Sequence, residues 1–136
     1  MIMNEKIAVD SNILIYLHDD TVVLKKQIAL KLMAKKPVIA AQVISEYLNV
    51  LKRLTKEPKL KLIEHCLLTV EECEIISINY NLIEKARSLI SKYDFQLFDS
   101  LIVASSLQAG CTILYSEDMQ HNQLVENQLR IINPFI

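Results

Sequence analysis

The sequence predicts an α/β fold, a three-layer α/β/α sandwich around a central parallel sheet of about five strands. Short apolar runs rich in β-branched residues recur along the chain, and segments with helical periodicity fill the intervals between them. Because the runs are almost entirely apolar, both faces of the sheet should be covered, which is typical of parallel sheets. The predicted strands are Ile7–Val9, Val38–Ala40, Ile75–Ile78, Thr112–Tyr115 and Arg130–Ile132.

Capping and helix-breaking residues mark the predicted helices. Thr21 and Asn79 are N-cap candidates, and Pro58 suits a first helical turn. Gly110 stands where a left-handed residue is wanted after a helix. The predicted helices extend from Thr21 to just before Pro37, over Gln42–Leu54, from Pro58 to about Val70, and over Tyr80–Lys92 and Leu97–Ala109.

Composition indicates one folded domain over residues 1–136. Apolar residues make up 51% of the chain, which excludes an intrinsically disordered protein. No apolar run approaches the ~20 residues of a membrane span. The N-terminal residues lack the pattern of a secretory signal, so we expect a cytoplasmic protein without membrane contact.

Cysteine and histidine spacing argues against a zinc site or a disulfide framework. The three cysteines form no CxxC pair, and the three histidines show no HxxxH or HExxH spacing. Any bound metal should therefore have oxygen ligands. The residues concerned are Cys66, Cys73, Cys111, His18, His65 and His121.

Charge is unevenly distributed along the chain, although the net charge is only −1. Residues 1–61 carry 11 Lys/Arg against 6 Asp/Glu, and residues 62–136 carry 4 against 10. Basic clusters of this kind can attract a phosphate backbone, but they are equally typical of the solvated faces of two helices.

Two acids follow predicted strands directly. Asp10 comes after Ile7–Val9, and Asp118 comes shortly after Thr112–Tyr115. Each could be an ordinary helix cap, a ligand, or both. Because parallel strands of one sheet present their carboxyl ends at one edge, we expect the two acids to share that edge.

Two further acids lie in predicted helices. Asp99 is in the first turn of an almost wholly apolar helix, where the helix dipole alone would not offset full burial of a carboxylate. Glu46 shares a helix face with Gln42, Asn49 and Arg53, and a solvated glutamate is the commoner interpretation of such a position.

If these four carboxylates converge, they will repel one another and need a compensating cation. All-oxygen ligation suits Mg²⁺ or Mn²⁺, and Mg²⁺ commonly works with substrate phosphates. The corresponding chemistry is phosphodiester hydrolysis by a metal-activated water.

The ordered segments VDSN, ISEYLNVL, FDSLIVASSLQAGCTILYSEDM and IINPF resemble the PIN domain family, in particular the VapC-like toxin ribonucleases. The resemblance covers the chain from Ile7 to Phe135 and implies a PIN-like fold. It also implies cleavage of RNA that depends on Mg²⁺ or Mn²⁺. By this resemblance Asp10, Asp99 and Asp118 would bind the metal, Glu46 would be a further ligand or a water-orienting base, and Asn12 and Ser116 would support the cluster.

The resemblance further implies a homodimer and, for the toxin members, inhibition by a small antitoxin protein. This chain departs from the family pattern in two places: Phe98 stands where many members have Trp, and Asn122 where Gly is common. Glu117 lies beside Asp118, which leaves open which of the two is the last ligand.

Two other functions are compatible with parts of the sequence. A PIN-fold RNA-binding or scaffold protein without catalysis usually lacks some of the acids, whereas here all four positions are filled. A haloacid-dehalogenase-like phosphatase would use Asp10 as its nucleophile and would need a second Asp at the position of Asn12.

Overall fold

The computed structural model describes residues 5–136 and has the predicted α/β architecture. The strands are short and the helices account for most of the ordered chain. Its elements are β1 (Ile7–Val9), α1 (Ser11–Tyr16), α2 (Val23–Met33), β2 (Ile39–Ala40), α3 (Ala41–Thr55), α4 (Lys59–Thr69), β3 (Ile75–Ile76), α5 (Tyr80–Tyr93), α6 (Leu97–Gln108), β4 (Ile113–Tyr115), β5 (Leu124–Val125) and β6 (Leu129–Ile132).

The strands lie in the spatial order β3-β2-β1-β4-β6-β5 within the described residues. The central pairs β1–β4 and β4–β6 are parallel, as is the β2–β3 pair. A parallel bridge between Ala8 and Val38 joins the β2–β3 pair to β1. Only β5 is antiparallel, and it pairs with the edge of β6. The expected parallel sheet of about five strands is therefore present, with one added strand.

The chain changes direction across the sheet at β1. From β1 it proceeds to β2 and β3 on one side, and later returns to place β4 on the other side of β1. In open α/β sheets, ligands bind at the carboxyl ends of the strands beside such a switch point. In this molecule the switch point is the gap between the ends of β1 and β4.

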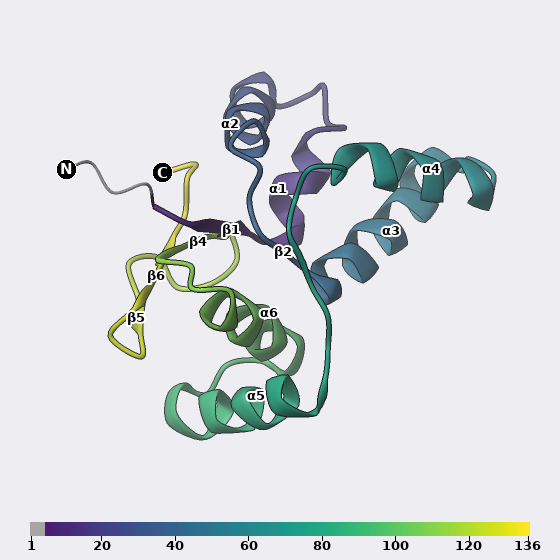
Figure 1. Ribbon diagram of the computed structural model, residues 1–136. Helices are drawn as coiled ribbons and strands as arrows, with labels where there is room; N and C mark the ends of the chain where they lie inside the picture. Colours follow the sequence, from purple (N-terminus) through teal and green to yellow (C-terminus); the bar gives the residue numbers. More distant parts are fainter. Residues whose placement is uncertain (1–4) are drawn as a thin grey trace.

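Helices cover both faces of the sheet. Figure 1 shows α1 and α2 on one side of the strands and α5 and α6 on the other, while α3 and α4 extend as a pair away from β2. Within residues 5–136, every helix falls short of the length and apolarity that crossing a membrane requires.

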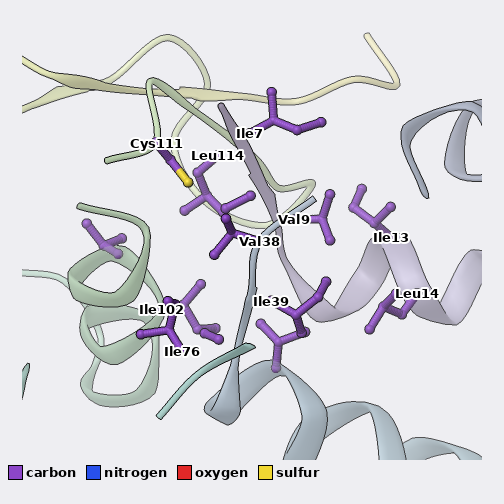
Figure 2. Packing of buried hydrophobic residues seen from close by; sticks show 14 of the residues in the cluster. Ile7, Val9, Ile13, Leu14, Val38, Ile39, Ile76, Ile102, Cys111 and Leu114 are labelled. Carbon is purple, nitrogen blue, oxygen red and sulfur yellow. The ribbon is translucent and has the colours of Figure 1, made fainter. Parts of the chain in front are cut away.

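The core is formed where the two helical layers meet the strands. Figure 2 shows Val9 pointing toward Ile13 of α1, whereas Val38 points toward the α6 side, where Ile102 lies. Val38 is bridged to Ala8, the residue before Val9, so the period of two of a β-strand places Val38 and Val9 on opposite faces of the sheet. All four side chains are buried, and burying each aliphatic side chain stabilises the fold by about 1.5–3 kcal/mol.

Two local predictions are corrected by the structure. Thr21 does not cap α2: the N-cap is Val22, without a side-chain hydrogen bond, and Thr21 instead donates from its backbone nitrogen and its hydroxyl to Asp19 Oδ1. Asp19 competes successfully because an aspartate readily closes a turn with the backbone two residues on. The short strand β5 has no counterpart among the predicted strands.

The turn between β5 and β6 is tied to α5. Glu126, which has a φ of +52°, accepts hydrogen bonds from Lys85 Nζ at 2.8 Å and from the Tyr93 hydroxyl at 3.2 Å. Lys92 Nζ lies 3.3 Å from the same carboxylate. These contacts hold the hairpin against the helix layer.

Pro58 lies one position before its predicted place, as the N-cap of α4, whereas Asn79 and Gly110 behave as predicted. Asn79 caps α5, since its side chain accepts a hydrogen bond from Leu82 N at 2.9 Å. Gly110 follows α6 with a φ of +79°. There, Cys111 N donates to Ser106 O and Gly110 N donates to Leu107 O, each at 3.0 Å. This is the Schellman motif, which ends α6 and directs the chain into β4.

We expect Gly110→Ala to lower the free energy of unfolding by about 1–2 kcal/mol, because a left-handed conformation is costly for a residue with a Cβ. No heavy atom lies within 4 Å of the position that this Cβ would take, so the loss isolates the backbone effect. Urea denaturation measures it. Gly110→Asn is the matched control and should lose less, since Asn tolerates positive φ; equal stability of the Ala variant and the wild type would contradict the prediction.

Candidate active site

Asp10 is held at the switch point by the pairing of β1 with β4. The register places Val9 opposite Tyr115, and Asp10 N donates to Tyr115 O at 2.9 Å. Ser116 therefore comes beside Asp10, and its hydroxyl donates to Asp10 Oδ2 at 2.7 Å. The other oxygen, Oδ1, accepts from Ser11 N at 2.7 Å, so Asp10 is also the N-cap of α1.

Burial makes the charged form of Asp10 costly. The residue is only 3% exposed, and desolvation is the main reason that the pKa of its carboxyl rises from 3.8 to about 6. The hydrogen bonds from Ser116 and from Ser11 N oppose this rise in the pKa, while the nearby charges of Asp99 and Glu46 add to it. A positive charge beside Asp10 would offset the cost of ionising its carboxyl.

Asp118 is connected to Asp10 through two polar side chains. Asn12 Nδ2 donates to Asp118 Oδ2 at 3.2 Å, and Asn12 Oδ1 accepts from Glu117 N at 3.3 Å. Ser116 Oγ accepts from the backbone nitrogens of Asp118 and Met119 at 3.3 and 3.2 Å. Asn12 and Ser116 are both buried, as expected of residues that fix the turn.

Glu46 is held by hydrogen bonds from α1 and from its own helix. Ser11 Oγ donates to Glu46 Oε1 at 2.8 Å, and Gln42 Nε2 donates to Oε2 at 3.1 Å. The neighbouring residue Tyr47 is fully buried, with its hydroxyl 2.5 Å from His18 Nε2. These contacts fix α3 against α1 with Glu46 beside the Asp10 turn.

Asp99 completes the set from α6. It lies in the first turn of that helix and is half-buried, not enclosed, because Leu97 and Phe98 beside it are exposed. Burial, followed by the negative charges of Glu46 and Asp118, raises the pKa of the Asp99 carboxyl. The four predicted acids thus share one electrostatic neighbourhood.

In the part of the chain that the structure describes, no basic side chain forms an ion pair with these four acids. Every ion pair within residues 5–136 involves a different acid, namely Glu74, Glu117, Asp20, Glu72 or Glu126. Uncompensated carboxylates in partial burial are a donor set that fits a hard divalent cation.

The geometry of the set is open. Across residues 5–136, no three side chains of the types His, Cys, Asp and Glu approach one another closely enough to enclose an ion by themselves. Mg²⁺ usually keeps several waters and takes only one or two protein carboxylates together with substrate phosphates. Binding of this partly hydrated kind needs fewer protein ligands than a closed cage does.

Glu117 behaves differently from its neighbour Asp118. Its Oε2 accepts from Lys25 Nζ and its Oε1 from the Tyr16 hydroxyl, both at 2.6 Å. Partial burial acts to raise the pKa of the Glu117 carboxyl, but the hydrogen bonds from Lys25 and Tyr16 outweigh it, and the pKa lies below its usual range. Both oxygens are thus engaged away from the other acids.

Several residues of this network are absent from the sequence prediction. Ser11 and Gln42 bind Glu46, and Lys25 and Tyr16 bind Glu117. In the sequence, Ser11 is marked only by following Asp10 directly, and Gln42 only by lying one helical turn before Glu46. Lys25 stood among other lysines, and nothing in the sequence pairs it with a residue 92 positions away.

Several solved structures with a similar fold are a toxin or toxin–antitoxin complexes. A toxin–antitoxin complex from Klebsiella pneumoniae aligns with a TM-score of 0.71 at 17% identity and covers 95% of this chain and 97% of its own. The Mycobacterium tuberculosis toxin VapC20, described as cleaving the sarcin–ricin loop, aligns with a TM-score of 0.66 at 18% identity over 83% of this chain and 90% of its own. VapBC2 from Rickettsia felis, bound to a promoter DNA fragment, aligns with a TM-score of 0.64 at 18% identity over 92% and 96%.

At such identities these structures establish the fold alone. No curated protein matches this sequence. The family model for the PIN domain matches residues 7–126, which include β1, all four acids and the β5 strand. This chain belongs to the PIN domain family.

Proposed function

We propose that this protein is an endoribonuclease that hydrolyses RNA phosphodiester bonds with Mg²⁺ or Mn²⁺. The observation that carries the proposal is the set of Asp10, Glu46, Asp99 and Asp118 at the carboxyl end of the parallel sheet, without a basic partner among residues 5–136.

In this proposal Asp10, Asp99 and Asp118 would bind the metal ion, either directly or through the waters that Mg²⁺ retains. When bound, the ion would supply positive charge for the phosphate and lower the pKa of the attacking water. Glu46 is oriented by Ser11 and Gln42, so its carboxylate is positioned as a further ligand or to accept the proton of that water. Asn12 and Ser116 hold the turn that carries Asp118.

The surface beside these acids supports RNA as the substrate. Arg53 lies on the same face of α3 as Glu46, seven residues further on, which is two helical turns or about 10 Å. Its side chain is exposed, as are those of Lys52, Lys56 and Lys59 nearby. A phosphate backbone that enters the acidic site would meet these cations along α3 and α4.

We further propose that the protein is a toxin of the VapC type, a cytoplasmic enzyme inhibited by a small antitoxin and assembled as a homodimer. The support is the resemblance of its fold to VapC toxins and to toxin–antitoxin complexes.

Asp10→Asn should abolish RNA hydrolysis, by a factor of about 100 or more, because it removes a charged ligand at the centre of the set. Cleavage of a labelled RNA in Mg²⁺ or Mn²⁺, with and without EDTA, measures this. Asp94→Asn is the matched control, because Asp94 is exposed at the end of α5 with a φ of +58°, where Asn is readily accommodated. Cleavage in EDTA, or a fully active Asp10→Asn protein, would contradict the nuclease proposal; RNA binding without cleavage by the wild type would favour the scaffold function.

Asp10→Asn should at the same time stabilise the metal-free protein at about pH 7.5. A folded pKa of about 6 in place of 3.8 means that the folded state binds the proton of Asp10 more tightly than the unfolded state does. Ionised Asp10 therefore costs no folding stability below the unfolded pKa of 3.8. The cost grows as pH rises from there through 6, to about 3 kcal/mol. Urea denaturation in EDTA should show the gain at about pH 7.5 and little of it at about pH 4. Added Mn²⁺ should stabilise the wild type but not the variant; a variant less stable at both pH values would refute this account.

Expression of the wild-type protein in a bacterial host should arrest growth, and Asp10→Asn should relieve the arrest. Sequencing of the RNA ends produced during the arrest would identify the cleaved RNA. Growth unaffected by an active nuclease would argue for a stand-alone enzyme in place of a toxin, as would the absence of a small neighbouring reading frame for an antitoxin.

A further inference from the structure

Glu117 is the second carboxylate of the turn that follows β4, directly before Asp118. We propose that Glu117, anchored by Lys25 and Tyr16, is a positioning residue that sets the place of Asp118, and is not itself a metal ligand. The inference rests on the proposed function, because it assigns a role within the same metal site.

The anchor joins three separate elements. Tyr16 is the last residue of α1, Lys25 lies in the first turn of α2, and Glu117 lies in the turn that follows β4. Lys25 Nζ also donates to the Tyr16 hydroxyl at 3.2 Å, so the three side chains form a closed triangle of hydrogen bonds. A charge-assisted set of this kind is stronger than neutral hydrogen bonds and more directional.

Two aromatic rings shelter the anchor. Lys25 Nζ lies 5.0 Å from the centroid of the Tyr16 ring and 5.4 Å from that of the Phe135 ring. The rings themselves meet edge to face, with centroids 5.0 Å apart. The Glu117 side chain is 23% exposed, in contrast to the 85% of Asp20 in the Lys26–Asp20 pair, while the two lysines are similarly exposed at 36% and 33%. Lower exposure to water makes the Lys25–Glu117 pair more than an ordinary surface ion pair.

The turn is thereby held from two sides. From the interior, Asn12 and Ser116 bind the backbone nitrogens of Glu117, Asp118 and Met119. From the exterior, the Glu117 side chain binds Lys25 and Tyr16. Asp118 itself is exposed, and within residues 5–136 its carboxylate accepts only the 3.2 Å hydrogen bond from Asn12. The position of that carboxylate therefore depends on the turn that carries it.

The anchor also neutralises a charge that would otherwise compete. Glu117 is adjacent to Asp118 in sequence, and a free carboxylate there could enter the site or repel its neighbour. With both oxygens bound and Lys25 beside it, Glu117 is kept out of the ligand set. Outer groups that orient ligands in this way typically change metal affinity by 10–100-fold when they are removed.

Lys25→Met tests the proposal, because it removes the charge and keeps most of the apolar stem over the rings. Lys26→Met is the matched control: it lies next in the same helix and removes the same charge, but its partner is Asp20, outside the site. In the metal-free proteins, hydrogen exchange of the Asp118 and Met119 amides should be faster in Lys25→Met than in Lys26→Met. Calorimetry should show Mn²⁺ binding about tenfold weaker in Lys25→Met, with Lys25→Arg restoring part of the affinity.

A double variant tests whether Lys25 affects metal binding through Glu117. If Lys25 acts through Glu117, the double variant Lys25→Met/Glu117→Gln should bind Mn²⁺ no more weakly than Lys25→Met alone. Unchanged amide exchange, or faster exchange with the same Mn²⁺ affinity as Lys26→Met, would overturn the positioning role. A wild type that binds no Mn²⁺ while its turn still loosens in Lys25→Met would overturn the proposed function, and with it any part of the anchor in metal binding.

Discussion

The buried hydrogen bond between Ser116 and Asp10 is the contact on which the arrangement of the site depends. It exists because β1 and β4 pair in parallel with Val9 opposite Tyr115, so that both strands end at the same level. A slip of that register by one residue would turn every side chain of the strand to the opposite face and separate the two turns. The hydrophobic faces of the strands, which specify the register, therefore also specify the site.

Burial of the Asp10 carboxylate at this contact lowers the stability of the metal-free protein. A carboxylate that is 3% exposed and has a pKa of about 6 destabilises the metal-free fold at neutral pH, although two hydrogen bonds offset part of the cost. Asp99, whose pKa is also raised, shares this cost. The apolar core between the sheet and its two helical layers offsets the free-energy cost of these carboxylates. A bound cation would offset it further.

How far the sequence predicts the structure differs between the core and the site. The five apolar runs were sufficient to predict the parallel strands, because a strand covered on both faces is apolar throughout. The strand β5 could not be predicted, since its two apolar residues stand alone between polar ones, from Gln120 to Gln128. Thr21 is a residue type that commonly caps helices, but its backbone nitrogen and hydroxyl donate to Asp19 instead. For the site, the positions of Asp10 and Asp118 followed from topology and Asp99 was indicated by its almost wholly apolar helix, whereas Glu46 required the family resemblance. The contacts of Ser11, Tyr16 and Lys25 depend on tertiary packing, which no local pattern encodes.

The edges of the sheet constrain how this protein can meet its partners. The outermost strands, β3 and β5, have two residues each, and the hairpin containing β5 is pinned to α5 through Glu126. So short an edge offers few free backbone groups to a strand from another chain, and it protects the protein from edge-to-edge aggregation. Assembly by β-augmentation is thereby disfavoured, and the surfaces left for recognition are helical, with side chains in place of backbone as the basis of specificity.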